Sequence, residues 1–155
     1  MSDTPALKDA RLIGVEHTVH RHGPVGSLAE AAELRGIEPS AVVKTMVVRT
    51  AEDAYVFVLV PGDRVIDWPK LRSHTDQRRL SMPDADEAFA VTGYRRGTIT
   101  PFGASTPWPV IADERLAGGA ISIGGGAPGV SITIDGATAI QILAAAIADV
   151  TKPSG

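Results

Sequence analysis

The segment AVVKTMVVRTAEDAYVFVLVPGD, residues 41–63, decides the fold class of this 155-residue chain. Two runs rich in β-branched and aromatic residues, 42–49 and 55–60, flank the short polar segment 50–54. Runs of this kind predict two strands joined as a hairpin. Pro61-Gly62-Asp63 is typical of a turn, so we expect the second strand to end there.

The residues before the hairpin predict one strand and one helix. Residues 14–22 alternate loosely between apolar and polar types, which indicates a strand that enters a turn at Gly23-Pro24. Ser27 and Glu30 have the spacing of a capping box at a helix start, and Gly36 is a common residue at a helix end.

The residues after the hairpin predict further helices and strands. Asp67 is expected to cap a short helix with Pro69 in its first turn, and residues 83–92 to form another helix that closes at Gly93. The Gly-, Thr- and Pro-rich segment 97–109 indicates a loop. The remaining expected elements are strands at 109–112, 120–123 and 130–134, a helix at 138–150 and a frayed tail at 151–155.

Strands that join as hairpins as well as through helices favour a mixed α/β or α+β fold around one sheet over a doubly wound parallel sheet. No internal repeat and no long linker divides the sequence. We therefore expect one domain covering residues 1–155.

Composition limits the classes of partner. The formal net charge is −3 and the isoelectric point is about 5.8, so any contact with RNA must be local. The best local candidate is the segment 64–79, which is either an RNA contact or a solvated charged face; its cations are Arg64, Lys70, Arg72, Arg78 and Arg79. The chain has no cysteine, no apolar run long enough to span a bilayer and no signal-peptide pattern at its start, which favours a cytoplasmic protein with no membrane partner.

Lys44 is the first candidate for chemistry, because it interrupts an apolar strand. Burial of a lone ammonium is costly, so this side chain either points outward or has a charged partner. A functional interpretation is a cation, fixed on a rigid element, that holds a phosphate or a developing oxyanion.

Two glycine-rich features are candidates for binding. Residues 93–103 hold three glycines and a proline, which indicates either an ordinary loop or a shaped turn whose backbone N–H groups bind an anion or a carbonyl oxygen. Gly118-Gly119 and residues 124–129 flank a short apolar strand, and hairpin turns or phosphate binding would explain their glycines.

Other sites are poorly supported by the sequence. His20 and His22 share one strand face, but no third ligand is apparent, so we expect no metal and no cofactor. A Ser-His-Asp hydrolase lacks its Gly-x-Ser-x-Gly elbow.

In order and spacing these segments resemble the YbaK/EbsC-type family of aminoacyl-tRNA deacylases, which also occurs as the editing domain of prolyl-tRNA synthetases. The resemblance covers about residues 20–150. It is carried by Val43-Lys44-Thr45; Val60-Pro61-Gly62-Asp63 with Asp67, Lys70 and Leu71; Thr92-Gly93-Tyr94; Gly97-Thr98-Ile99-Thr100-Pro101-Phe102-Gly103; Gly125-Gly126 with Gly129; and Ala148-Asp149-Val150.

The resemblance implies a partly closed, barrel-like sheet surrounded by helices. It also implies metal-independent hydrolysis of the ester between a mischarged small amino acid, such as Cys, Ala or Ser, and the acceptor end of a tRNA, with tRNA-Pro as the expected tRNA. A docking partner would be prolyl-tRNA synthetase, and no DNA partner is expected. By position, Lys44 matches the essential lysine of the family; substrate-binding positions are His20, Gly97, Thr98, Ile99, Thr100, Pro101, Gly103, Gly125 and Gly126.

The sequence departs from the family pattern in three places. His20 stands where cysteine-editing relatives usually carry tyrosine, and the segment 124–126 lacks the Asn-x-His element of alanine-editing relatives. Pro128 stands where many members carry a basic residue. Two alternatives to the tRNA deacylase stay open, namely a non-catalytic module that binds an aminoacyl-adenosine-like ligand and a hydrolase of another small acyl ester.

Overall fold

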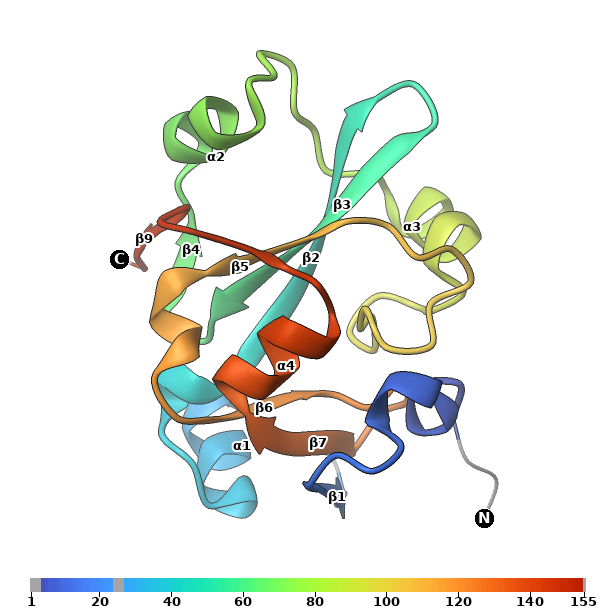
Figure 1. Ribbon diagram of the computed structural model, residues 1–155, viewed down its shortest axis with the longest axis vertical. Coiled ribbons are helices and arrows are strands. Elements are labelled where there is room, and N and C mark those ends of the chain that lie inside the picture. The colour runs from blue at the N-terminus through green and yellow to red at the C-terminus, as the bar shows by residue number, and fades with distance from the viewer. Residues whose placement is uncertain (1–3, 24–26, 155) are drawn as a thin grey trace.

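The computed structural model describes residues 4–23 and 27–154, and their strands form three sheets (Figure 1). The central sheet is mixed and has the order β2-β3-β5-β8, formed by Val43–Ala51, Ala54–Pro61, Val110–Asp113 and Ala146–Ala148. The second sheet is antiparallel and has the order β1-β7-β6, formed by His17–Arg21, Val130–Asp135 and Ala120–Gly124. The third is the antiparallel pair of β4 and β9, Arg64–Ile66 and Thr151–Pro153.

Short helices surround these sheets. The α-helices are α1 to α4, which cover Leu28–Arg35, Trp68–Thr75, Ala85–Thr92 and Gly136–Ile142. The 3-10 helices are η1 to η4, which cover Ala6–Lys8, Ala10–Leu12, Pro39–Ala41 and Glu114–Ala117. No helix in the described residues is long and apolar enough to cross a membrane.

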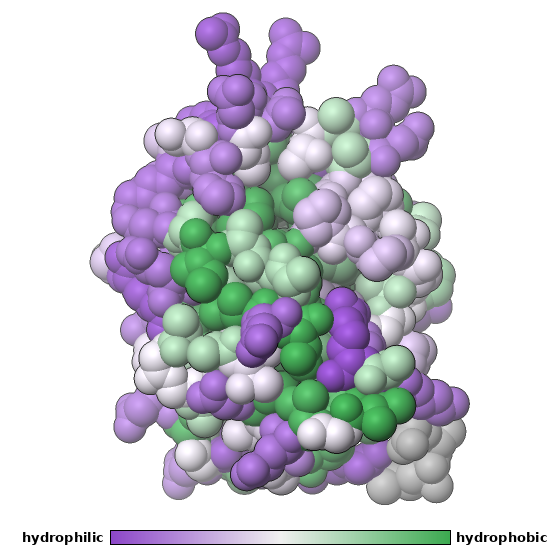
Figure 2. Space-filling view, viewed as in Figure 1, coloured by the Kyte–Doolittle hydropathy of each residue, from purple (hydrophilic) through white to green (hydrophobic). Residues whose placement is uncertain are grey.

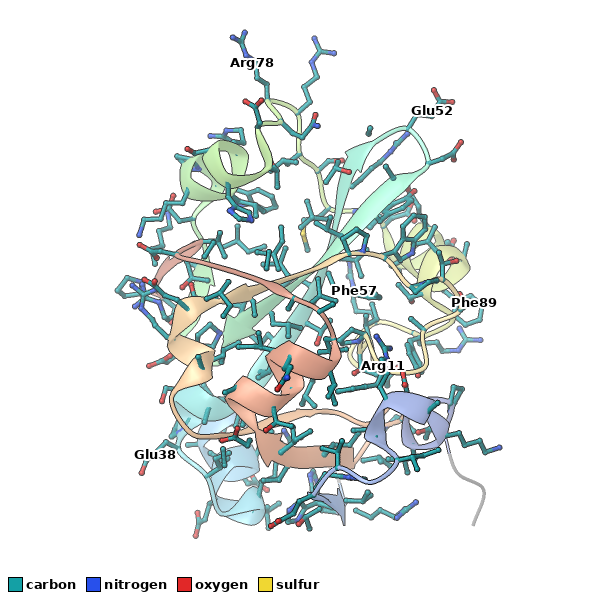
Figure 3. The ribbon with its side chains drawn as sticks, in the orientation of Figure 1. Arg11, Glu38, Glu52, Phe57, Arg78 and Phe89 are labelled. Atoms are coloured by element: carbon teal, nitrogen blue, oxygen red, sulfur yellow. The ribbon has the colours of Figure 1, made fainter. Side chains whose placement is uncertain are left out.

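The predicted hairpin is confirmed as β2 and β3, with Lys44 opposite Val60. Both of its faces are covered, which explains why both strands read as nearly continuous apolar runs. One face carries Val43, Val47 and Phe57 into the larger hydrophobic cluster, and Phe57 lies near the middle of the molecule in Figure 3. The other face contributes Val48, Val58 and Val60 to a smaller cluster, which is completed by Ile66, Leu71, Ile111 and Val150.

The helix caps predicted from sequence are confirmed. The side chain of Ser27 accepts a hydrogen bond from the Glu30 N–H, and Gly36 ends α1 in the left-handed conformation. Asp67 likewise accepts from the Lys70 N–H at the start of α2. The predicted strand 14–22 is shorter than expected, Pro24 of its predicted turn lies outside the described residues, and the predicted helix 83–92 corresponds to α3.

The expectation of one partly closed, barrel-like sheet is not confirmed. The described strands form three open sheets, and a single bridge between Val42 and Ser122 links the central sheet to the β1-β7-β6 sheet. The α/β class itself is correct, because parallel pairs β3–β5 and β5–β8 lie beside the antiparallel hairpin.

The predicted helix at 138–150 is too long. Helix α4 ends at Ile142, Ala144 takes a left-handed φ of 53°, and the chain continues as β8 along β5. The reason is that the edge of β5 has backbone N–H and C=O groups with which a neighbouring strand can pair. A short apolar run can form that strand, and its sequence pattern does not distinguish the strand from a helix. Ile147, within the segment predicted as helix, is 54% exposed. Figure 2 shows that apolar side chains gather in the middle of the molecular face drawn there.

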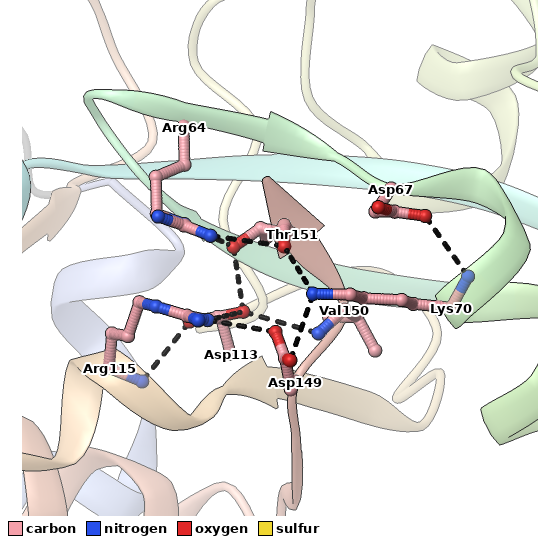
Figure 4. Close-up of polar contacts among 8 residues, drawn as sticks. All are labelled: Arg64, Asp67, Lys70, Asp113, Arg115, Asp149, Val150 and Thr151. Atoms are coloured by element: carbon pink, nitrogen blue, oxygen red, sulfur yellow. Dashed lines mark hydrogen bonds and ion pairs between the residues drawn. The ribbon is translucent and has the colours of Figure 1, made fainter. Parts of the chain in front are cut away.

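The predicted frayed tail is also wrong for the described residues, because β9 pairs with β4 and a buried polar network holds it there (Figure 4). The fully buried Asp113 accepts hydrogen bonds from the Thr151 hydroxyl, at 2.8 Å, and from the guanidinium of Arg115. Arg64 donates to the Thr151 hydroxyl at 2.7 Å, and Lys70 donates to Asp149 at 2.9 Å.

This network uses two of the five cations of the segment 64–79, namely Arg64 and Lys70. Arg78 and Arg79 are exposed beyond α2, where Figures 2 and 3 show polar side chains projecting from one end of the molecule. The segment is therefore partly structural, and only its distal end presents exposed arginines.

Candidate active site

A pocket of about 380 Å³ lies beside the outer edge of β2. One wall is formed by residues 42–47 of the hairpin, and the facing walls come from the loop 96–99 and the turn between β6 and β7. The remaining lining residues are Arg35, Met82, Pro83, Ala88, Gly124, Ala127, Gly129 and Val130.

The edge of β2 in this pocket presents unpaired backbone groups. Arg49 and Ser81 exchange two backbone hydrogen bonds, of 2.8 and 3.2 Å, on the side of β2 away from β3. The backbone N–H and C=O groups of successive residues point to opposite sides of a strand. Those of Thr45 and Val47 therefore point away from β3, as those of Arg49 do. No partner within the described residues takes up these groups, so the pocket wall offers both donors and acceptors.

Lys44 is half-buried, and its ammonium donates a hydrogen bond to the backbone carbonyl of Arg64. Burial lowers the pKa of Lys44 from its usual value, and the nearby negative charge of Asp63 opposes that shift. The Lys44 side chain therefore neither points freely into solvent nor forms an ion pair in the described structure. The expected alternatives, an outward side chain or a charged partner, therefore do not describe Lys44, because a backbone carbonyl is its hydrogen-bond partner at the boundary of the pocket.

Two arginines add positive charge to the pocket. Arg35, in the last turn of α1, donates to the hydroxyl of Ser122 at 3.2 Å, and burial lowers the pKa of its guanidinium. Arg96 lines the pocket from the loop and is exposed. The lining includes no carboxylate among the described residues, so with Lys44 it carries three cations and suits an anionic ligand.

The loop facing Lys44 presents backbone N–H groups. Gly97 has a φ of 89°, which favours glycine, and a methyl group on its Cα would meet open space. The N–H groups of Gly97 and Ile99 have no hydrogen-bond partner among the described residues, whereas the N–H of Thr98 closes a turn onto the Arg95 carbonyl at 2.9 Å. The loop therefore brings two backbone N–H groups without a partner among the described residues to the lining of the pocket.

The far end of the same loop is anchored to the N-terminal segment. The carboxylate of Asp9 accepts a hydrogen bond of 2.7 Å from the N–H of Gly103 and a bidentate pair from Arg11. Arg11 also donates to the Pro101 carbonyl at 3.2 Å and lies over the ring of Phe102. These bonds outweigh the effect of burial, which by itself would raise the pKa of Asp9, and lower that pKa to about 2.

Tyr94 fixes the loop from the other side. Its hydroxyl donates to the Phe102 carbonyl at 2.7 Å, and burial raises the pKa of Tyr94 to about 12. Gly126 lies against the Tyr94 ring, where an added methyl group would come within 2.9 Å. This contact gives a physical reason why Tyr94 and Gly126 both occur among the residues that carry the family resemblance.

The structure brings some of the predicted site residues together. Lys44, Gly97, Thr98 and Ile99 line the pocket. Thr100 and Pro101 are buried behind it, and Gly103 packs against the backbone of Pro5.

The other predicted positions lie next to the pocket rather than in its lining. The N–H of Gly125 donates to the Val130 carbonyl, and Gly126 packs on Tyr94, so both shape the β6–β7 turn. His20 pairs with Ser131, which in turn pairs with the pocket residue Gly124. Sequence reasoning missed Arg35, whose one signal is a basic residue just before the helix-ending Gly36; that position is usually explained by the helix dipole.

Comparison with known proteins now identifies the family. Residues 22–142 match the model of the aminoacyl-tRNA editing domain. The chain belongs to the aminoacyl-tRNA editing domain family. This confirms the resemblance found in the sequence.

Relatives of this editing domain are both free-standing proteins and parts of larger ones. A protein of Enterococcus faecalis named as a Cys-tRNA(Pro)/Cys-tRNA(Cys) deacylase, EbsC, is 27% identical over 126 residues, which are 81% of this chain and 77% of that protein. A proline–tRNA ligase of Levilactobacillus brevis is 33% identical over 90 residues, 58% of this chain but 16% of the ligase. The chain thus spans about a sixth of the length of that ligase.

A solved structure shares the fold of this editing domain. The crystal structure described as a trans-editing enzyme for prolyl tRNA synthetase superposes with a TM-score of 0.83 and 24% identity, over the full length of both chains. The hypothetical protein APE2540 superposes with a TM-score of 0.82 over 92% of this chain and 95% of its own. At this identity the likeness concerns the fold.

Proposed function

We propose that this editing domain is a hydrolase that removes a mischarged small amino acid from tRNA, with tRNA-Pro as the substrate and Cys, Ala or Ser as the amino acid removed. The observation that carries the proposal is the juxtaposition, across one pocket, of three cations with the free N–H groups of Gly97 and Ile99. The acceptor end of a tRNA supplies a matching ligand, because it combines a phosphate with an ester carbonyl. The names of the relatives support the same substrate class.

In this proposal different pocket residues bind different parts of the substrate. Lys44, with Arg35 and Arg96, holds the phosphate before the terminal adenosine and so places the ester beside the loop. The N–H groups of Gly97 and Ile99 donate to the carbonyl oxygen and stabilise the negative charge that develops on it. The unpaired backbone carbonyls at the edge of β2, at Thr45 and Val47, are available to accept hydrogen bonds from the amino group of the substrate.

Hydrolysis then needs only water. A water molecule attacks the carbonyl carbon, the bond from that carbon to the ribose oxygen breaks, and the ribose oxygen leaves as a hydroxyl group after taking up a proton. The amino acid leaves as a carboxylate and a proton is released to solvent. The neighbouring ribose hydroxyl lies within reach of both oxygens and can relay the proton.

Lys44→Met tests the proposal. The substitution keeps an unbranched apolar stem, and because burial disfavours the charged lysine, the fold is expected to keep its stability. Deacylation of cysteinyl-, alanyl-, seryl-, threonyl- and prolyl-tRNA-Pro is measured at fixed enzyme concentration, with Lys8→Met as the matched control at an exposed lysine. We expect a loss of about 100- to 1,000-fold on the preferred substrate in Lys44→Met, and no change in the control.

A folded Lys44→Met variant that works within threefold of the wild type would remove Lys44 from the reaction. A wild-type protein that hydrolyses none of the five substrates but binds an uncharged acceptor end would instead favour a non-catalytic binding module.

A further inference from the structure

A second pocket, of about 410 Å³, adjoins the first at Lys44, Met46 and Met82. Its other walls are β3, β4, β9 and the first residue of α2, which contribute Val60, Val65, Ile66, Lys152 and Trp68. The ammonium of Lys44 is bound to the backbone carbonyl of Arg64 in β4, so this cation lies between the two pockets. A ligand that fills the first pocket can therefore continue into the second past Lys44.

Trp68 is the aromatic wall of this second pocket. It is half-exposed, and its indole N–H has no hydrogen-bond partner among the described residues. The other tryptophan behaves differently, because the Trp108 indole donates to the Val91 carbonyl at 2.7 Å and its ring packs edge-on to Tyr55 at 5.1 Å. Trp68 is thus a partly exposed aromatic side chain with an unused donor, packed on the smaller hydrophobic cluster.

The charged residues that line the second pocket, Lys44 and Lys152, are both cations. Lys152 is exposed on β9 and is the register partner of Val65, which lies in the same pocket. The lining includes no carboxylate within the described residues. An aromatic surface beside cations is the combination that binds single-stranded nucleic acid, since bases stack on the ring and phosphates meet the cations.

We infer that the second pocket receives the base of the nucleotide that precedes the terminal adenosine of the substrate RNA, stacked on Trp68 with its phosphate near Lys152. The inference rests on the proposed function for its ligand, because the terminal adenosine and its ester occupy the first pocket. The shared wall at Lys44 makes the two binding events consecutive along one RNA strand.

Fluorescence of Trp68 tests the inference without any catalysis. Trp108→Phe leaves Trp68 as the sole indole, and the trinucleotide CpCpA is titrated against adenosine monophosphate as the single-nucleotide control. We expect CpCpA to quench the emission in a saturable way and adenosine monophosphate to leave it nearly unchanged. Equal quenching by both ligands, or no quenching by either, would overturn the inference.

Two substitutions separate stacking from packing. Trp68→Leu keeps apolar volume but removes the aromatic face, and Trp68→Phe keeps a smaller face. By fluorescence anisotropy of a labelled CpCpA, Trp68→Leu is expected to weaken binding about 5- to 150-fold, and Trp68→Phe to restore part of it. Circular dichroism shows whether both variants are folded. Wild-type affinity in a folded Trp68→Leu variant refutes the inference.

Deacylation then distinguishes this inference from the proposed function. Trp68→Leu should raise KM for the aminoacylated tRNA and leave kcat, as well as hydrolysis of an aminoacyl-adenosine, unchanged. If neither the wild-type protein nor any variant deacylates the aminoacyl-tRNA, the proposed function is refuted. The quenching by CpCpA still tests whether the second pocket binds RNA. If Lys44→Met abolishes deacylation but Trp68→Leu alters neither KM nor binding, the proposed function stands and the second pocket has no part in RNA binding.

Discussion

Asp9→Asn is expected to lower both thermal stability and deacylation, because Asp9 fixes the far end of the pocket loop. The carboxylate holds the N–H of Gly103 at 2.7 Å and the Arg11 guanidinium through both of its oxygens. An asparagine keeps one acceptor oxygen but turns an NH2 group toward either Gly103 or Arg11, so one of these bonds is lost. The loop that carries Gly97 and Ile99 then loses its anchor.

The size of the effect follows from the pKa of Asp9, which lies at about 2 instead of the ordinary 3.8. That difference is equivalent to about 2 kcal/mol, and solvent around Arg11, whose side chain is 37% exposed, reduces it to about 1–2 kcal/mol. For a chain of this length, about 2–8 °C in Tm is expected. Because folding lowers this pKa, the stabilisation is complete above the unfolded value near 3.8 and is lost as the pH falls toward 2.

The assay is the difference in Tm between the wild type and Asp9→Asn, measured from pH 7 down to pH 2.5. The difference should be constant above about pH 5 and shrink below pH 4. Asp135→Asn is the matched control, because Asp135 caps α4 at an exposed position away from the loop, and it should leave deacylation unchanged. A difference in Tm that stays the same at pH 3 and pH 7 would refute the electrostatic account of this anchor.

Gly97→Ala should cost about 1 kcal/mol of backbone strain at most, because the added methyl group meets no other atom, yet it should slow deacylation at least tenfold. Gly103→Ala should lower the Tm far more, because the methyl group of the alanine would lie 2.3 Å from the backbone of Pro5. Equal losses of Tm would contradict this contrast. Thr45→Val should raise Tm and keep deacylation within threefold, because the buried Thr45 hydroxyl has no partner among the described residues; a large loss of turnover would show that this hydroxyl serves the substrate. His20→Tyr is expected to change the relative rates across the five aminoacyl-tRNAs, and unchanged ratios would remove His20 from selectivity.

The parts of the fold that sequence predicts well are those with local causes. The hairpin follows from two β-branched runs, and the starts of α1 and α2 follow from the caps Ser27 and Asp67. Each of these signals lies within the element that it specifies. A reading of the sequence alone therefore places them within a residue or two.

The parts that sequence reasoning missed have distant causes. Strands β4, β8 and β9 are three residues long and exist because a partner strand offers a free edge. Nothing in the segment 146–148 distinguishes such a strand from the continuation of a helix. The same holds for Arg35, which enters the pocket because α1 packs beside Ser122 and not because of its own sequence context.

Lys44 shows how both kinds of cause meet in the site. An ammonium group within an apolar strand is unusual, and this feature is visible in the neighbouring sequence, so sequence alone could identify Lys44 as a candidate. Its position depends on the Arg64 carbonyl, and Arg64 in turn is tied through the Thr151 hydroxyl to the buried carboxylate of Asp113 (Figure 4).

These linked hydrogen bonds give a physical reason why residues that do not line the pocket, such as Lys70 and Asp149, are among those that carry the family resemblance. The pair of Lys70 and Asp149 lies on the surface, where an isolated ion pair adds little stability. Yet Arg115 joins Asp149 to Asp113, so the pair closes the same network that holds β9 against β4. Because β4 carries the carbonyl that orients Lys44, residues near the end of the chain position a cation near its beginning.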